Sequence, residues 1–307
     1  LSGLGIRATL TGDSSLSKRP MLRVIKPLMD MGTNIKSNDG KAPIRIIESN
    51  ISNDYKYDMP IASAQVKSSL LLASLSSNKS ITITEPKITR NHTERMIEYF
   101  GGDIQYDDKT RKGYIKLGKK NLIPKESYEV VGDFSSASFM IVAALIAKES
   151  NLVIKNVGLN PTRSGLINIL LQMGANIEVK NQTLICNEES ADLIVKSSSL
   201  HGIEVPENII PNIIDEMPIL SIAAAFSEGT TIIKNASELR VKESDRLNAI
   251  SEGLSKLNIN HKTFEDGISI TGNTNDISVH EEIDSFDDHR IAMSFLIAGI
   301  KSKNGVV

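Results

Sequence analysis

Three short segments of the sequence combine acids and cations in patterns that could bind an anion and move a proton. RVKESDRL at 240–247 places three cations and two acids within eight residues. IIPNIIDEMPIL at 209–220 sets two acids, Asp215 and Glu216, in an otherwise apolar run, where loss of water raises the pKa of a carboxylate and suits it to proton transfer. DDHR at 287–290 adds a histidine and an arginine. Together they indicate an anion site with acid–base groups.

A simpler interpretation competes with this one at each segment. On a helix, Lys242 and Arg246 would share one face, and such a like-charged pair costs about 0.2–0.5 kcal/mol unless something negative faces it. Glu243 with Arg246, and Lys242 with Asp245, are spaced to supply that negative charge locally. Asp215 could equally be a helix cap, and DDHR could be a salt-bridged surface. From the local sequence both interpretations stand.

An alternating repeat supplies the elements that must position these residues. Its first pattern runs strand, loop, arginine, helix, turn and strand. The four copies span 9–35, 81–104, 152–177 and 231–259. Their arginines, each eleven to thirteen residues before a turn residue (Gly32, Gly101, Gly174, Asn258), are Arg19, Arg90, Arg163 and Arg246. The sequence therefore predicts four copies of one α/β unit.

The second pattern is a polar start followed by a helix rich in Ala and Ser. Its copies span 63–75, 135–147, 215–227 and 288–300. Small residues around most of the helix predict close packing on all sides, and hence buried helices. The recurrence suits a unit of βαβαββ size, and KSKNGVV at the end is typical of the start of another copy, so we expect the chain to be a part of a longer repeat protein.

Both patterns place polar residues where a helix begins. A helix N-terminus carries about half a positive charge and unpaired N–H groups, so several that converge can hold a phosphate or carboxylate. We expect Asp133, Ser135 and Ser136 to serve mainly as helix caps. Arg163, in the turn-like NPTRSG, is interpreted as structural.

Composition limits the possible partners and cofactors. The net charge of −2 gives no general attraction for nucleic acid or an acidic membrane. Cys186 is the single cysteine, which excludes an internal disulfide and fits a reducing cytoplasm. The longest apolar run, at 139–147, is too short to span a bilayer. The five histidines lack paired ligand spacing, so we expect no metal site.

Eight motifs in one order carry a resemblance to a known family. They are KRPMLRV, ASAQVKSSLLLASL, TRNHTERM, GDFSSASF, NPTRSG, IIDEMPIL, LRVKESDRL and DDHRIAM. This series resembles the 5-enolpyruvylshikimate-3-phosphate (EPSP) synthase family, in its class II bacterial form, along the whole chain. The resemblance implies an α/β (α+β) fold of two lobes, built from repeated βαβαββ units with buried helices. The lobes would be 1–131, on the shikimate 3-phosphate side, and 132–307, on the phosphoenolpyruvate and acid–base side.

The family's reaction transfers the enolpyruvyl group of phosphoenolpyruvate to the 5-hydroxyl of shikimate 3-phosphate and releases phosphate, in chorismate and aromatic amino-acid biosynthesis. The resemblance implies a cytoplasmic monomer that uses no cofactor. It implies that Asp215 takes the hydroxyl proton, and that Glu243 with Lys242 exchanges protons at the methylene carbon. The implied contacts to shikimate 3-phosphate are Ser63, Gln65, Thr89, Arg90, Asp215 and Lys242. Those to phosphoenolpyruvate are Arg19, Gln65, Arg246, His289 and Arg290.

Departures from the family pattern lead to a further expectation and two alternatives. The family's N-terminal lysine–serine segment and its C-terminal phosphoenolpyruvate-binding lysine do not occur in this sequence, so we expect the 307-residue chain alone to be inactive. One alternative is a UDP-N-acetylglucosamine enolpyruvyl transferase, which shares the chemistry and typically uses a loop cysteine. The other is a non-catalytic anion-binding relative.

Overall fold

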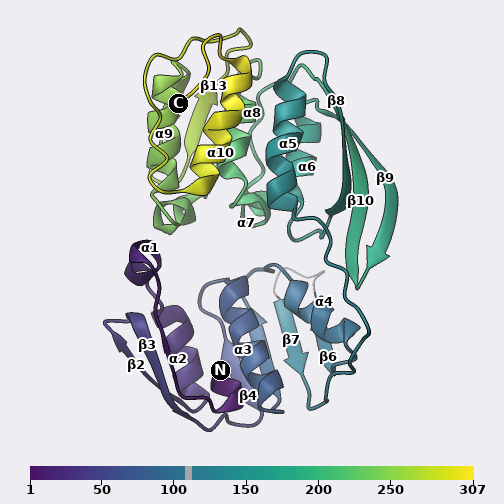
Figure 1. The fold of residues 1–307 in the computed structure, drawn as a ribbon, viewed down its shortest axis with the longest axis vertical. Helices are drawn as coiled ribbons and strands as arrows, with labels where there is room; N and C mark the ends of the chain where they lie inside the picture. Colours follow the sequence, from purple (N-terminus) through teal and green to yellow (C-terminus); the bar gives the residue numbers. More distant parts are fainter. Residues whose placement is uncertain (108–112) are drawn as a thin grey trace. The chain divides into compact units, whose positions relative to one another are not determined.

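The computed structural model describes residues 1–107 and 113–307, which form two compact units, Leu1–Glu129 and Val130–Val307 (Figure 1). Both units mix helices and sheets, as the sequence predicts. Unit 1 contains α1 (Ser14–Lys18), α2 (Leu22–Asp30), α3 (Ala64–Ser76) and α4 (His92–Tyr99). Unit 2 contains α5 (Phe134–Ile146), α6 (Gly165–Gln172), α7 (Ile210–Ile213), α8 (Met217–Ala225), α9 (Arg246–Lys256) and α10 (His289–Ala298).

The four copies of the first sequence pattern fold into four sheets with one shared topology. In each copy a strand leads through a helix to a hairpin, and the last strand pairs antiparallel with the other two. In unit 1 the strands are β1 (Ala8–Leu10), β2 (Thr33–Asn38) and β3 (Lys41–Ser49), then β5 (Ile81–Glu85), β6 (Ile104–Asp107) and β7 (Gly113–Leu117). In unit 2 they are β8 (Asn151–Gly158), β9 (Asn176–Ile185) and β10 (Glu188–Lys196), then β11 (Thr230–Ile233), β12 (Asn260–Thr263) and β13 (Ile268–Thr271). One sheet has an added strand, β4 (Tyr55–Asp58), parallel to β5.

The turn predicted after each first-pattern helix has a left-handed backbone in all four copies. The φ angles are 107° at Gly32, 75° at Gly101, 90° at Gly174 and 55° at Asn258. Glycine adopts this conformation without steric cost, and asparagine tolerates it better than most residues. These residues therefore end the helices and turn the chain toward the next strand.

The prediction that the Ala- and Ser-rich helices are buried is confirmed for α5 and α8, at the centre of unit 2, but α3 and α10 are buried on one side only, with Leu72 and Leu296 exposed. Every residue of α8 is buried, and α5 is buried along most of its length. Figure 1 draws α5, α8 and α10 side by side, and residue contacts link all three. Their small side chains let helix backbones approach closely, so the polar residues at their starts are held by a rigid core.

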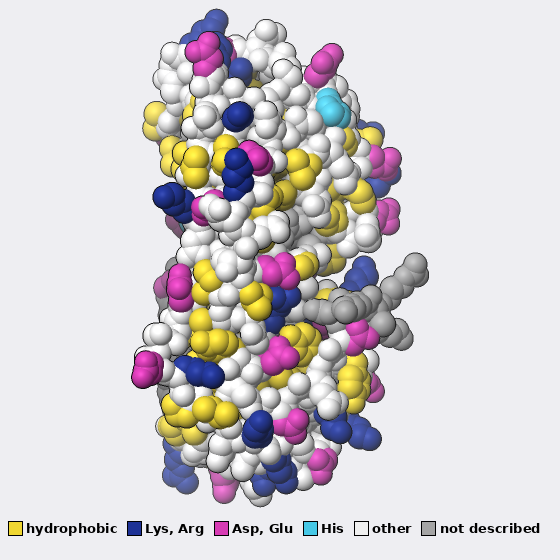
Figure 2. Space-filling view, turned by 90° about the vertical axis from the view of Figure 1, so that its right-hand side faces the viewer, with side chains coloured by type: hydrophobic (Ala, Val, Ile, Leu, Met, Phe, Trp, Pro, Cys, Tyr) yellow, Lys and Arg dark blue, Asp and Glu magenta, His cyan; other side chains and the backbone are white. Residues whose placement is uncertain are grey.

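Each unit has its own apolar core. The core of unit 2 joins α5, α6, α8, α9 and α10 to the inner faces of its sheets. In unit 1, buried residues of α3, such as Leu70 and Leu71, pack with Ile81 and Ile83 of β5. On the face drawn in Figure 2, acidic and basic side chains are interspersed, in keeping with the small net charge. In the described ranges, the helices are all too short or too polar to cross a membrane.

Candidate functional site

Asp215 lies in the turn between α7 and α8, where three cations surround its carboxylate. Arg163 Nη1 is 3.4 Å from Oδ2, while Arg246 Nη1 and Lys242 Nζ are 3.6 and 3.7 Å from Oδ1. The side chain of Asp215 is 12% exposed, so these charges act on it with limited screening by water. The three cations come from the segment before α6, the loop before α9, and the first residue of α9. Cations from several elements thus hold the carboxylate, which remains 12% exposed.

Arg246 is buried to 1% exposure, which requires compensation of its charge. Its Nε donates to Asp288 Oδ2 at 2.7 Å, and its Nη2 donates to Glu243 Oε2 at 2.6 Å. Nη1 has no hydrogen-bond acceptor among the described residues and lies 3.6 Å from Asp215. A buried donor of this kind can donate a hydrogen bond to an anionic ligand without losing an existing one.

Asp288 is fully buried and combines two structural roles. It caps α10 by accepting the backbone N–H of Arg290 at 3.0 Å, and it also accepts from Ser244 Oγ at 3.2 Å. Burial alone would raise the pKa of Asp288, but its hydrogen bond and its charge attraction with Arg246 outweigh burial and hold that pKa below 3.8.

Replacing Asp288 with Asn tests this arrangement, since Asn caps a helix equally well but carries no charge. We expect the free energy of unfolding at pH 7 to fall by about 3 kcal/mol, because the buried charge of Arg246 loses its fully buried carboxylate partner. In the unaltered protein this stabilisation is complete above pH 3.8 and is lost as the pH falls through the lowered pKa. Urea unfolding followed by circular dichroism at pH 7 and pH 3 measures both effects.

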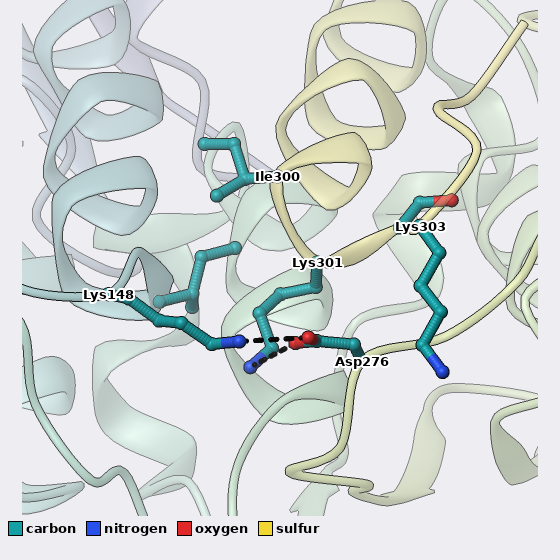
Figure 3. A pocket seen from close by; sticks show the side chains of 7 residues that line it. Lys148, Asp276, Ile300, Lys301 and Lys303 are labelled. Carbon is teal, nitrogen blue, oxygen red and sulfur yellow. Dashed lines mark hydrogen bonds and ion pairs between the residues drawn. The ribbon is translucent and has the colours of Figure 1, made fainter.

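Asp276 provides the matched control. Figure 3 shows it in a shallow pocket of unit 2, ion-paired at 2.9 Å with Lys148 and at 3.3 Å with Lys301. The pocket contains none of the residues predicted for the site. Because the pair with Lys148 is exposed, Asp276→Asn should change stability much less than Asp288→Asn does. Equal losses for Asp276→Asn and Asp288→Asn would contradict a special role for the buried pair.

Lys242 and Glu243 lie in the loop between a 3₁₀ helix, Ser237–Val241, and α9. Lys242 Nζ contacts Glu238 at 2.9 Å as well as Asp215. The expectation that Lys242 and Arg246 share a helix face is wrong, because Asp245 caps α9 by accepting the N–H of Asn248 and the helix starts at Arg246. Lys242 and Glu243 therefore lie in a loop, and helix geometry does not fix the direction of their side chains relative to Arg246.

The local charge pairs of this segment also differ in part from the expected ones. The expected pair of Glu243 with Arg246 is present, but Asp245 pairs with Arg240 at 2.9 Å instead of with Lys242. Lys242 instead lies between Glu238, at 2.9 Å, and Asp215, at 3.7 Å.

The DDHR segment contributes Arg290 to the same cluster. Arg290 Nη1 donates to the backbone oxygen of Asp215 at 3.1 Å and lies 3.7 Å from Glu216 Oε1. His289 is the first residue of α10 and is exposed. In unit 2 the structure therefore brings Asp215, Lys242, Glu243, Arg246 and Arg290 together, and leaves His289 at the surface beside them.

Glu216 joins this cluster although the sequence analysis assigned it no role. Its side chain is fully buried, accepts a hydrogen bond from Ser135 Oγ, and lies 3.2 Å from Arg163 Nη1. Burial raises the pKa of Glu216, although the neighbouring Arg163 acts in the opposite direction. Asp133 caps α5 as predicted, by accepting the backbone N–H groups of Ser135 and Ser136, but these two serines, also expected to be caps, lie inside the helix.

In unit 1 the predicted residues Ser63 and Gln65 sit at the start of α3. Ser63 caps the helix by accepting the N–H of Val66, and the Gln65 side chain accepts from Arg23 Nη2 at 3.2 Å. Arg23 belongs to α2, in the same repeat as Arg19, which follows α1. Arg23 thus adds a cation beside Gln65 that the sequence analysis did not select.

The loop before α4 carries the other predicted pair, Thr89 and Arg90, and buried groups hold it. Glu85 accepts both the backbone N–H of Thr89, at 3.0 Å, and its hydroxyl, at 2.7 Å. Lys67 lies 3.2 Å from Glu85 and 2.7 Å from Glu94, and all three side chains are at most 2% exposed. Burial raises the pKa of Glu94, with Lys67 acting in the opposite direction.

The predicted phosphoenolpyruvate contacts are divided between the units. Arg19 and Gln65 belong to unit 1, and Arg246, His289 and Arg290 belong to unit 2. Within the two ranges that the structure describes, no three His, Cys, Asp or Glu side chains are grouped so that they could hold a metal ion.

Comparison with known proteins gives one consistent match. A family model described as EPSP synthase (3-phosphoshikimate 1-carboxyvinyltransferase) matches residues 1–307. The chain is 48% identical to the 3-phosphoshikimate 1-carboxyvinyltransferase of Petrotoga mobilis, over 100% of this chain and 70% of that protein. It is 46% identical to the Legionella pneumophila (strain Corby) protein of the same name, over 94% of this chain and 65% of that protein. The solved structure of EPSP synthase from Acinetobacter baumannii matches with a TM-score of 0.85 and 43% identity, over 100% of this chain and 70% of that one.

Proposed function

Because the chain belongs to the EPSP synthase family, we propose that it carries the residues of a 3-phosphoshikimate 1-carboxyvinyltransferase. The reaction joins the enolpyruvyl group of phosphoenolpyruvate to the 5-hydroxyl of shikimate 3-phosphate and releases phosphate. It serves the biosynthesis of aromatic amino acids. Both substrates are anions, which suits a site whose predicted residues include several arginines.

Asp215, Glu243 and Lys242, all in unit 2, transfer the protons of the reaction. Addition requires a base to remove the proton of the attacking hydroxyl and an acid to protonate the methylene carbon of phosphoenolpyruvate. We assign the first task to Asp215 and the second to Glu243, assisted by Lys242. Elimination then takes a proton back from the same carbon as phosphate leaves, so Glu243 acts in both steps.

The arginines bind the anionic groups of the substrates. Arg246, Arg290 and Arg19 hold phosphoenolpyruvate, with Gln65 and His289 beside them. A guanidinium presents two parallel N–H donors, which match a carboxylate or a phosphate. Ser63, Gln65, Thr89 and Arg90 hold shikimate 3-phosphate together with Lys242. Fixed donors of this kind stabilise negative charge in the transition state without reorganising.

The observation that carries the proposal is the convergence of Lys242 and Arg246 on Asp215, within 3.7 Å of one carboxylate oxygen. An acid, a lysine and a buried arginine from separate elements meet at one point, beside Glu243 at 2.6 Å from Arg246. A salt-bridged surface helix would not require a buried arginine with an unpaired donor.

Phosphate release by the complete gene product tests the proposal. We expect release when shikimate 3-phosphate and phosphoenolpyruvate are both present, and none when either is omitted. UDP-N-acetylglucosamine offered in place of shikimate 3-phosphate should give no release. Release with phosphoenolpyruvate and the nucleotide sugar, but not with shikimate 3-phosphate, would support the alternative transferase. Binding of shikimate 3-phosphate without any release would identify a non-catalytic relative.

The proposal also includes a monomeric state and a cytoplasmic location, both taken from the sequence. Size-exclusion chromatography with light scattering tests the first, since the measured molar mass of a dimer would be twice that of the monomer. Cell fractionation tests the second.

A further inference from the structure

Two consecutive acids, Asp215 and Glu216, begin α8, and only the first has an assigned task. Glu216 is the N-cap residue of α8, yet its side chain makes no capping hydrogen bond. It points into the protein, where it is fully buried and accepts from the hydroxyl of Ser135. A buried carboxylate that does not cap its own helix requires another reason for its burial.

Arg163 supplies that reason, because it bridges the two acids. Its Nη1 lies 3.2 and 3.3 Å from the two oxygens of Glu216 and 3.4 Å from Oδ2 of Asp215. Its Nη2 donates to Ser135 Oγ, and that hydroxyl donates in turn to Glu216. Arg163, Ser135 and Glu216 thus form a closed set of hydrogen bonds and ion pairs. Such a set restricts the guanidinium to one orientation.

The two oxygens of Asp215 face different partners. Oδ2 faces Arg163, whereas Oδ1 faces Lys242 and Arg246. Arg163 is itself held by Glu216, so it fixes the rotation of the Asp215 carboxylate about its Cβ–Cγ bond. The oxygen beside Lys242 and Arg246 is then presented in a constant direction.

We infer that Arg163, anchored by Glu216 and Ser135, is a positioning residue that orients Asp215 for proton transfer. The inference rests on the proposed function, in which Asp215 accepts the hydroxyl proton. Arg163 belongs to the first-pattern arginines, but its contacts assign it to the acid and not to a substrate anion. Both Nη atoms of Arg163 already contact Asp215, Glu216 or Ser135, whereas Nη1 of Arg246 has no hydrogen-bond acceptor among the described residues.

A double-mutant cycle between Arg163 and Asp215 in the complete gene product distinguishes orientation from other roles. Arg163→Gln should lower kcat by about 10- to 100-fold, the range expected from a misplaced catalytic group. The KM values for both substrates should change by less than about threefold, because no substrate contact is lost. In an Asp215→Asn background, the same substitution should change kcat by less than about threefold.

Two further variants complete the design. Arg163→Lys keeps the charge and should recover part of the lost kcat; it replaces Arg163→Gln in the cycle if thermal melting shows that the Gln variant is unfolded. Lys180→Gln removes an exposed cation from β9, 3.2 Å from Glu178, and should leave kcat unchanged.

Each remaining outcome overturns a specific statement. Equal losses of kcat from Arg163→Gln in both backgrounds would show that Arg163 acts independently of Asp215. A large rise in the KM of either substrate, with kcat retained, would make Arg163 a substrate contact. No phosphate release by the unaltered protein would overturn the proposed function and the inference together.

Discussion

Asp215→Asn should lower kcat by about 10²- to 10⁴-fold, the usual contribution of a general base. The amide has nearly the same size as the carboxylate but cannot take a proton from the attacking hydroxyl. The KM for phosphoenolpyruvate should stay constant or fall, because the substitution removes a negative charge that faces Arg163, Lys242 and Arg246. Steady-state measurement of phosphate release gives both constants.

Asp245→Asn is the matched control for this prediction. Asp245 lies in the same unit, is paired with Arg240, and caps α9, a role that Asn also fills. Its activity should remain within about twofold of the unaltered protein, as expected for a surface ion pair. If Asp215→Asn lowered kcat by no more than this control, Asp215 would not be the base.

Lys67→Met should lower the free energy of unfolding of unit 1 by about 3–5 kcal/mol, the cost of breaking a buried ion pair from one side. The substitution keeps the length of the side chain but leaves Glu85 and Glu94 facing each other without a cation. Tyrosine fluorescence during urea unfolding measures the effect in this unit alone, because the chain has no tryptophan and its six tyrosines all belong to unit 1. They are Tyr55, Tyr57, Tyr99, Tyr106, Tyr114 and Tyr128.

Lys56→Met serves as the exposed control and should stay within about 0.5 kcal/mol. Adding Glu94→Gln to Lys67→Met should recover part of the loss, since it removes one of the two unpaired charges. In the unaltered protein the raised pKa of Glu94 means that stability falls as the pH rises above 4.5 through that pKa, and Glu94→Gln removes this slope. A Lys67→Met variant as stable as the control would show that the buried cluster contributes nothing.

The repeat and its helices could be predicted because their signals are local and periodic. Gly32, Gly101 and Gly174 mark turns that require a left-handed backbone, and this requirement is visible in the sequence. The cap at Asp133 was recognisable for the same reason. The first pattern placed Arg246 at the entry to a helix, and α9 starts there; the capping role of Asp245 was not predicted, although Asp is a common capping residue.

The buried ion pairs could not be predicted in the same way, because their partners are distant in the sequence. Arg163 and Asp215 are 52 residues apart, and Arg246 and Asp288 are 42 residues apart. The turn-like sequence around Arg163 is the same whether the side chain meets solvent or an acid. Lys67, in a helix of small and apolar residues, likewise showed no sign that two glutamates from other elements surround it.

Asp288 connects the stability of a helix to the state of the site. The same carboxylate accepts the N–H of Arg290, in the first turn of α10, and holds the guanidinium of Arg246. Fraying of α10 at its first turn and release of Arg246 therefore become one opening event with one free energy. Hydrogen exchange at the amide of Arg290 would then report how often the buried arginine leaves its place, even without substrate. The first turn of α10 must therefore stay folded for Arg246 to keep its position.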